Sequence, residues 1–196
     1  MNNRVYGMEN SATGRRMDTQ EETQTQTPVG HTWLKWVVSG WGLGLLRPAP
    51  GSWGSCAPAI IFWGLIYFSL SDLMRSIICV GLALLASILT VLLGPWAQKY
   101  FQKPDPGSMV LDEFAGYWIA CLFIRVPSQA SGNIWLSWLM AAGIYILFRL
   151  FDTIKLPPCR ALEKLPRGWG ILLDDIAAGV QVNIVLQILL RVIFKG

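Results

Sequence analysis

Two pairs of neighbouring acids, Asp112 with Glu113 and Asp174 with Asp175, stand beside long stretches of apolar sequence. Paired carboxylates offer the oxygen ligands that a hard divalent cation such as Mg²⁺ prefers, and this ion often shares its ligands with a substrate phosphate. An acid near the start of a helix can also serve only to stabilise the positive end of the helix dipole. Taken alone, each pair leaves metal binding and helix capping open.

Small residues follow both pairs in the sequence: Ala115 and Gly116 after the first, and Ala177, Ala178 and Gly179 after the second. Small residues allow membrane helices to approach closely, and residues four apart lie on the same face of a helix. Each pair therefore has an acid that shares a face with a glycine. If the two faces meet, four carboxylates crowd together, and they cannot all be ionised without compensating positive charge. Mg²⁺ could supply that charge, and so could an ion-pair network with lysines and arginines.

A basic motif, FRLFDTIKLPP, places Arg149, Asp152 and Lys155 three residues apart, which predicts one slanted stripe on a helix that Pro157 and Pro158 end. A guanidinium and an ammonium beside an acidic metal cluster are suited to holding a phosphate. Basic residues also flank membrane helices on the cytoplasmic side without any further role. The motif by itself leaves these two interpretations open.

The stretch RPAPGSWGS predicts a loop, because Pro48, Pro50, Gly51 and Gly54 all disfavour a continuing helix. Glycine lets backbone N–H groups close on an anion, and Ser52 adds a hydroxyl. A plain turn before a membrane helix is the alternative.

The composition indicates which elements position these residues. Of the 196 residues, 53% are hydrophobic and only 14% are charged, whereas about 25% of a soluble domain is charged. Three runs without charged side chains exceed the roughly 20 residues needed to span a bilayer, namely Pro48 to Ser71, Ser76 to Gln98 and Val126 to Phe148. Two further segments with acids at their N-terminal ends are predicted to span fully or partly, Leu111 to Pro127 and Ile171 to Ile193.

The expected fold is all-α, a small polytopic membrane helical bundle of about five spanning or partly spanning helices. Residues 33–46 (WLKWVVSGWGLGLL) are short, apolar and interrupted by glycine, which predicts an interfacial or re-entrant helix with tryptophan anchors. Residues 1–32 are polar and predict a disordered tail, so that residues 33–196 form a single membrane domain.

The distribution of basic residues predicts the orientation of this bundle. With five passes and the N-terminus in the cytoplasm, twelve of the sixteen lysines and arginines fall on the cytoplasmic side, and four fall on the other side, Arg75, Arg125, Arg191 and Lys195. This agrees with the positive-inside rule. All four polar motifs then reach the cytoplasmic face of the membrane, where they could assemble one site. No motif supports nucleic-acid binding.

Four stretches, GLGLLRPAPGSWGS, LDEFAGYW, FRLFDTIKLPP and GWGILLDDIAAG, in this order and at this spacing, resemble the phosphatidylglycerophosphatase A family over about residues 36–193. The resemblance implies a Mg²⁺-dependent phosphatase of phospholipid biosynthesis, which converts phosphatidylglycerophosphate in the bilayer to phosphatidylglycerol and inorganic phosphate. It implies that the catalytic residues are Asp112, Glu113, Asp152, Asp174 and Asp175. It further implies that Asp112, Glu113, Asp174 and Asp175 hold the metal and that Arg149, Lys155, Gly51 and Ser52 bind the phosphate. Ser52 stands where the family commonly has threonine and keeps the hydroxyl.

Other chemistries have less support in the sequence. The four cysteines lack the Cys-x5-Arg spacing of cysteine phosphatases, and the single histidine, His31, lies in the polar tail. Two alternatives stay open: a phosphatase of another lipid or soluble phosphomonoester, and a non-enzymatic membrane carrier. A carrier would have acids at the bilayer midplane and repeated halves.

Overall fold

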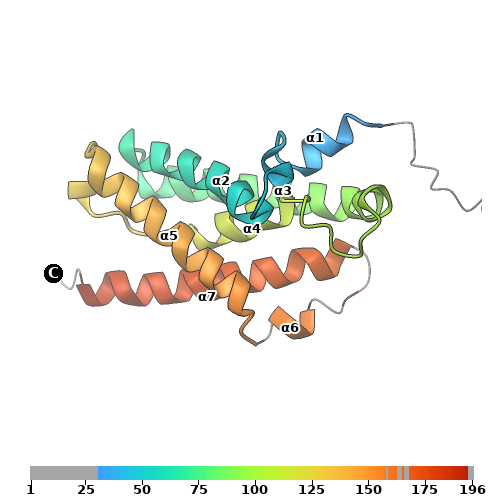
Figure 1. The fold of residues 1–196 in the computed structure, drawn as a ribbon. Coiled ribbons are helices and arrows are strands. Elements are labelled where there is room, and N and C mark those ends of the chain that lie inside the picture. Colours follow the sequence, from blue (N-terminus) through green and yellow to red (C-terminus); the bar gives the residue numbers. More distant parts are fainter. Residues whose placement is uncertain (1–30, 158, 163–164, 166–167, 194–196) are drawn as a thin grey trace, which may run out of the picture. The chain divides into compact units, whose positions relative to one another are not determined.

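The long apolar runs form helices, as expected where backbone polar groups must be satisfied without water. The computed structural model describes residues 31–157, 159–162, 165 and 168–193, all of them in the compact unit His31–Gly196. The regular elements among them are α1 (Leu34–Val38), the 3₁₀ turn η1 (Leu43–Leu45), α2 (Pro50–Tyr67), α3 (Asp72–Phe101), α4 (Leu111–Ala120), the 3₁₀ turn η2 (Ser128–Ala130), α5 (Ile134–Ile154), α6 (Cys159–Leu162) and α7 (Gly168–Ile193) (Figure 1). The described part contains no strand, and the all-α prediction is confirmed. The expected tail lies outside the described residues except for His31 and Thr32.

By length and composition, three helices in the described part can cross a membrane, within Asp72–Phe101, Ile134–Ile154 and Trp169–Val192. α2 was expected to be a secure span but is not among them, because its eighteen residues begin with a polar Pro-Gly-Ser sequence. α4 has ten residues, a length of about 15 Å, against a hydrocarbon core of roughly 30 Å. α4 therefore enters the bundle without crossing it.

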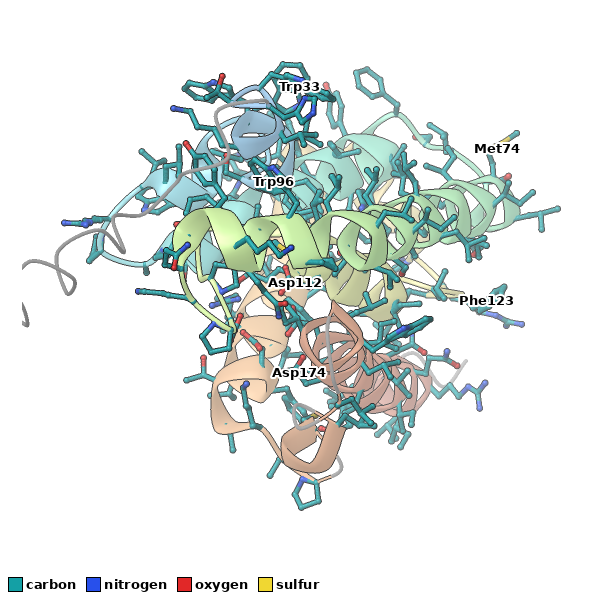
Figure 2. All side chains as sticks on the ribbon, turned by 90° about the vertical axis from the view of Figure 1, so that its right-hand side faces the viewer. Trp33, Met74, Trp96, Asp112, Phe123 and Asp174 are labelled. Atoms are coloured by element: carbon teal, nitrogen blue, oxygen red, sulfur yellow. The ribbon has the colours of Figure 1, made fainter. Side chains whose placement is uncertain are left out.

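The exposed surface of α3 is that of a helix surrounded by lipid. Large apolar side chains such as Met74, Leu84 and Leu92 are exposed, whereas the inner face is built from small residues including Ala83 and Ala86. Without a hydrophobic force between helices in lipid, small residues at the contacts allow close packing. The side chain of Met74 points outward in Figure 2.

α4 is buried among the longer helices, which explains how a half-length helix can end inside an apolar bundle. The Asn183 side-chain amide of α7 donates to the carbonyl oxygens of Ala120 and Leu122, at 3.1 and 2.6 Å. These carbonyls at and beyond the end of α4 would otherwise lack partners. At mid-helix, the Tyr117 hydroxyl donates to the carbonyl of Ala141 in α5 at 3.2 Å. Hydrogen bonds with neighbouring helices thus take the place of the hydrogen bonds that α4 would otherwise form with water.

The expected interfacial helix at residues 33–46 is shorter than its apolar pattern indicated. The backbone takes positive φ angles at Gly40, Trp41 and Gly42, which separates α1 from η1. The Trp41 side chain is 90% exposed, as an interfacial anchor would be. The carbonyl of Val38 accepts a hydrogen bond of 3.0 Å from the N–H of Val110, so this segment fixes the residue directly before α4.

Candidate active site

A cavity of about 240 Å³ lies where the loop before α4, the start of α4, the end of α5 and the first part of α7 meet. It is lined by Asp105, Gly107, Met109, Asp112, Glu113, Asp152, Thr153, Lys155, Ile171, Asp174 and Asp175. Asp112 and Asp174 lie one above the other near the centre of Figure 2. The structure therefore brings all five acids expected from the sequence to one cavity, at one end of the helices.

The α4 pair occupies the first turn of its helix. Asp112 is buried, and within the described part of the chain its Oδ1 atom has no hydrogen-bond partner. Glu113 Oε1 lies 3.3 Å from Arg149 Nη1. Burial and the nearby Glu113 carboxylate raise the pKa of Asp112 well above its ordinary value. Burial also raises the pKa of Glu113 to about 7, although the Arg149 guanidinium opposes this. The cavity therefore brings together more carboxyl groups than its cations could neutralise if all of them were ionised.

The α7 pair lies deeper in its helix than the sequence suggested. α7 begins at Gly168, so Asp174 and Asp175 come after its first turn, and the helix dipole acts mainly within that turn. Helix capping is therefore the wrong interpretation for this pair. Asp174 Oδ2 accepts a hydrogen bond of 3.0 Å from Lys155 Nζ. Asp175 is 4% exposed and forms no ion pair among the described residues.

Two glycines bring the acid pairs together. A Cβ atom on Gly116 would lie 2.6 Å from the carbonyl oxygen of Asp175, and one on Gly179 would overlap the carbonyl oxygen of Gly116. The backbones of α4 and α7 are thus in direct contact at positions where only glycine fits. The two small-residue faces, whose meeting the sequence left open, are in contact in the structure.

Arg149 and Lys155 differ in conformation although their spacing predicted a single stripe. Arg149 lies within α5, where its Nη1 is 2.9 Å from Asp152 Oδ2. Lys155 is the C-cap of α5, with a left-handed backbone at φ 49°. The helix therefore ends one residue before Lys155, and the ammonium extends to Asp174 on α7 instead of continuing the stripe. Both basic groups form ion pairs with cavity acids.

The stretch RPAPGSWGS is not a loop beyond Ala49, because α2 begins at Pro50. Proline is favoured in the first turn of a helix, where its missing N–H has no acceptor to lose. A Cβ atom on Gly51 would overlap Glu113 Oε1 and lie 2.8 Å from Arg149 Nη2. Gly51 and Ser52 do not line the cavity itself, but Gly51 lets the start of α2 pack against the Glu113–Arg149 pair.

The donor set fits a loosely held hard cation. In the part of the chain that the structure describes, no three histidine, cysteine or acidic side chains converge into a closed metal site. Mg²⁺ does not need such a cage, since it usually keeps several waters and takes one or two carboxylates plus substrate phosphate. Three buried carboxylate oxygens of residues that line this cavity have no hydrogen-bond partner among the described residues, namely Asp112 Oδ1, Glu113 Oε2 and Asp174 Oδ1.

Sequence reasoning missed Asp105, which lines the same cavity from the loop before α4. Its negative charge acts on Asp112 and Glu113, contributing to the raised pKa of both. The sequence DPGSMVLDE did not indicate a site residue at this position, because an acid beside proline and glycine is typical of an ordinary turn.

Comparison with known proteins gives a consistent result. The family model described as phosphatidylglycerophosphatase A matches residues 36–190. A phosphatidylglycerophosphatase A of Haemophilus influenzae is 38% identical over 76% of this chain and 84% of its own length. One of Escherichia coli is 36% identical over 82% of this chain and 85% of its own. A Bacteroides thetaiotaomicron protein named "putative phosphatidylinositol-3-phosphatase" is 32% identical over 78% of this chain and 90% of its own. No solved structure matches.

These matches show that the chain belongs to the phosphatidylglycerophosphatase A family, and it is therefore a phosphatase, a hydrolase of phosphoric monoesters. The bacterial relatives and the three apolar helices support a membrane-associated bacterial protein. Membership of an enzyme family removes the support for a non-enzymatic carrier.

Proposed function

We propose, from the chain's membership of the phosphatidylglycerophosphatase A family, that it hydrolyses phosphatidylglycerophosphate to phosphatidylglycerol and inorganic phosphate during phospholipid biosynthesis. The observation that carries this proposal is the single cavity in which acids from α4, α5 and α7 meet Lys155, with Arg149 beside them. A guanidinium and an ammonium can bind phosphate oxygens, and carboxylates can hold a metal ion that assists phosphoryl transfer.

Arg149 and Lys155 are proposed to hold the phosphate of the substrate. Each is already oriented by an acid, Arg149 by Asp152 at 2.9 Å and Lys155 by Asp174 at 3.0 Å. A guanidinium offers two parallel N–H groups to phosphate oxygens, whereas an ammonium acts as a compact point charge. Asp152 either keeps Arg149 in position or acts as a base.

The first turn of α2 is proposed to assist them. The N–H groups of Gly51 and Ser52 belong to the turn whose donors have no acceptor within the helix, and a helix N-terminus favours an anion. Because Gly51 packs on Glu113 and Arg149, this turn is close enough to act with Arg149. Ser52 also offers a hydroxyl.

Asp112, Glu113, Asp174 and Asp175 are proposed to hold Mg²⁺. Asp112 and Asp175 would be its direct ligands, whereas Glu113 and Asp174, which are paired with cations, would act from the outer shell. Asp112 and Asp175 support this proposal most strongly, because both are buried and neither forms an ion pair with a described residue. When bound, Mg²⁺ would supply positive charge to the phosphoryl oxygens and orient or activate the attacking water. Direct attack by water and a transient aspartyl-phosphate are both compatible with this arrangement.

The cavity is proposed to face the cytoplasm from the bacterial inner membrane. Lys99, Lys103 and Arg47 lie at the same ends of their segments as the cavity, whereas Arg75 and Arg125 lie at the opposite ends. Loops rich in basic residues stay in the cytoplasm, and this distribution supports a cytoplasmic position for the cavity end.

The test is release of inorganic phosphate from phosphatidylglycerophosphate by the detergent-purified chain, first with Mg²⁺ and then with excess chelator. Release that stops with chelator and returns with Mg²⁺ is the expected result. Release unaffected by chelator would contradict the metal assignment. No release from folded protein under either condition would contradict the substrate assignment.

A phosphatidylinositol phosphate is the second candidate substrate, since the Bacteroides relative's name describes that activity. Both lipids carry a terminal phosphomonoester on a polar alcohol. Rates measured with the two lipids in matched detergent micelles separate the candidates. We expect at least about tenfold higher kcat/KM for phosphatidylglycerophosphate, the discrimination that a few headgroup contacts provide.

A further inference from the structure

A second hollow, next to the acid-lined cavity, is lined by basic and amide side chains instead of acids. It is an open hollow with a volume of about 420 Å³, and it is lined by Pro95, Gln98, Lys99, Gln102, Lys103 and Pro104 at the C-terminal end of α3. These residues include two lysines and no acid. Because α3 is long enough to span a membrane, its last turn lies at headgroup depth.

The two lysines are held on the same side by the way α3 ends. Gln102 has a left-handed backbone at φ 54°, and the N–H of Lys103 donates to the carbonyl of Gln98 at 3.2 Å. This reversal folds Lys103 back beside Lys99, so both line one hollow. Neither forms an ion pair with any residue that the structure describes. Arg149 and Lys155, in contrast, are both paired with acids.

Two consecutive residues border this hollow and the acid-lined cavity. Pro104 lines the basic hollow and the next residue, Asp105, lines the cavity. This segment is held in place because Gln98 Nε2 donates to the carbonyl of Pro104 at 2.6 Å. One small molecule with two anionic groups could therefore reach both spaces.

We infer that the Lys99–Lys103 hollow binds the phosphodiester of a lipid whose terminal phosphomonoester occupies the acid-lined cavity. This inference rests on the proposed function, because phosphatidylglycerophosphate carries both groups, joined through one glycerol. Two unpaired ammonium groups at headgroup depth suit a phosphodiester anion. At the cavity, Arg149, Lys155 and the proposed Mg²⁺ would offset the acids when the phosphomonoester binds, whereas the hollow offers the diester two lysines and no acid.

The experiment compares wild type with the double variant Lys99→Gln, Lys103→Gln in mixed micelles containing Mg²⁺. We expect KM for phosphatidylglycerophosphate to rise about tenfold, with kcat changed much less, because two charges near an anionic lipid are lost. Phosphatidylglycerol, which carries only the diester, should inhibit wild type competitively and the double variant more weakly. Inorganic phosphate, which probes the cavity, should inhibit both equally.

Lys35→Gln is the matched control. Lys35 lies in α1 with its Nζ 5.2 Å from the centre of the Trp36 ring, and it does not line the hollow. An equal rise in KM in this control would indicate general attraction of anionic lipid and would overturn the inference. A charge-retaining variant, Lys99→Arg with Lys103→Arg, should keep KM near the wild-type value.

Three further results would overturn the inference. Unchanged KM and unchanged inhibition by phosphatidylglycerol in the double variant would overturn the subsite while leaving the proposed function intact. Equal weakening of inhibition by phosphate and by phosphatidylglycerol would indicate distortion of the whole site and would also overturn it. If wild type released no phosphate from this lipid, the proposed function would fail and the subsite with it.

Discussion

The acid pairs of α4 and α7 have the same sequence pattern, in which an acid precedes a glycine by four residues, but their helices hold them differently. Asp112 and Glu113 lie in the first turn of a ten-residue helix. Asp174 and Asp175 lie beyond the first turn of a 26-residue helix. The helix dipole therefore helps only the first pair. Since the second pair is kept without that help, stabilisation of a helix end cannot be the shared reason for the pattern.

Their ion pairs reveal what the two pairs do share. In each, one acid pairs with a cation of the α5 region, Glu113 with Arg149 and Asp174 with Lys155. The other acid, Asp112 or Asp175, is buried without an ion pair among the described residues. This division separates two acids that position cations from the two acids that are proposed to bind Mg²⁺ directly.

The largest expected effect comes from the acids without ion pairs. Asp112→Asn and Asp175→Asn should each lower kcat more than about a hundredfold, because loss of a metal ligand exceeds the cost of losing an outer-shell partner. Phosphate release measures the loss, and the midpoint of thermal unfolding should stay near that of wild type. Mg²⁺ should raise that midpoint in wild type but not in either variant. Near-normal turnover in both would remove the distinction between the two kinds of acid.

A smaller effect is expected from the cation-paired acids. Glu113→Gln and Asp174→Asn should lower kcat/KM by about 10- to 100-fold, the usual cost of losing an outer-shell partner. Double-mutant cycles sharpen the comparison: Asp174 should be coupled to Lys155, whereas Glu113 should show little coupling to Lys155. Coupling of equal size in both cycles would indicate one shared network of charges instead of two separate pairs.

The smallest expected effect concerns the contact that joins the pairs. Gly179→Ala forces a methyl group against the carbonyl of Gly116, and overpacking of this kind costs about 1–3 kcal/mol of unfolding free energy. The matched control is Gly143→Ala in α5, where a Cβ atom would meet nothing within 4 Å. Unfolding in detergent should show the loss in the first variant only. Equal stability of both variants would mean that the two backbones can separate without cost.

The sequence was sufficient to predict that these motifs converge. The sequence predicted about five spanning or partly spanning helices, whereas the structure has three helices that can span and a half-length α4. The polar motifs nevertheless lie at one end of the bundle, because each motif stands where its helix begins or ends at that end. The spacing also placed an acid and a glycine on one face of each helix, but it did not determine that Gly116 and Gly179 would meet, which depends on how the two helices pack.

Helix boundaries were harder to predict. α7 starts six residues before Asp174, because Gly168 and Trp169 continue the helix although the sequence suggested a start near the acids. α2 starts at Pro50, since proline is accepted in a first turn. Asn183 and Asp105 were missed because their roles depend on contacts with α4 and the cavity, which local sequence does not reveal.

The close contact at Gly179 also restricts the number of residues that can separate Asp175 from Gly179. Because each helical residue turns by about 100°, the four residues from Asp175 to Gly179 fix the direction of the acid relative to the point where α7 touches α4. One alanine inserted between them would leave hydropathy and charge almost unchanged, yet it would turn Asp175 out of the cavity. The length of this segment is thus more strictly constrained than its composition. Relatives with the same activity should tolerate substitutions between the acid and the glycine, but not insertions or deletions.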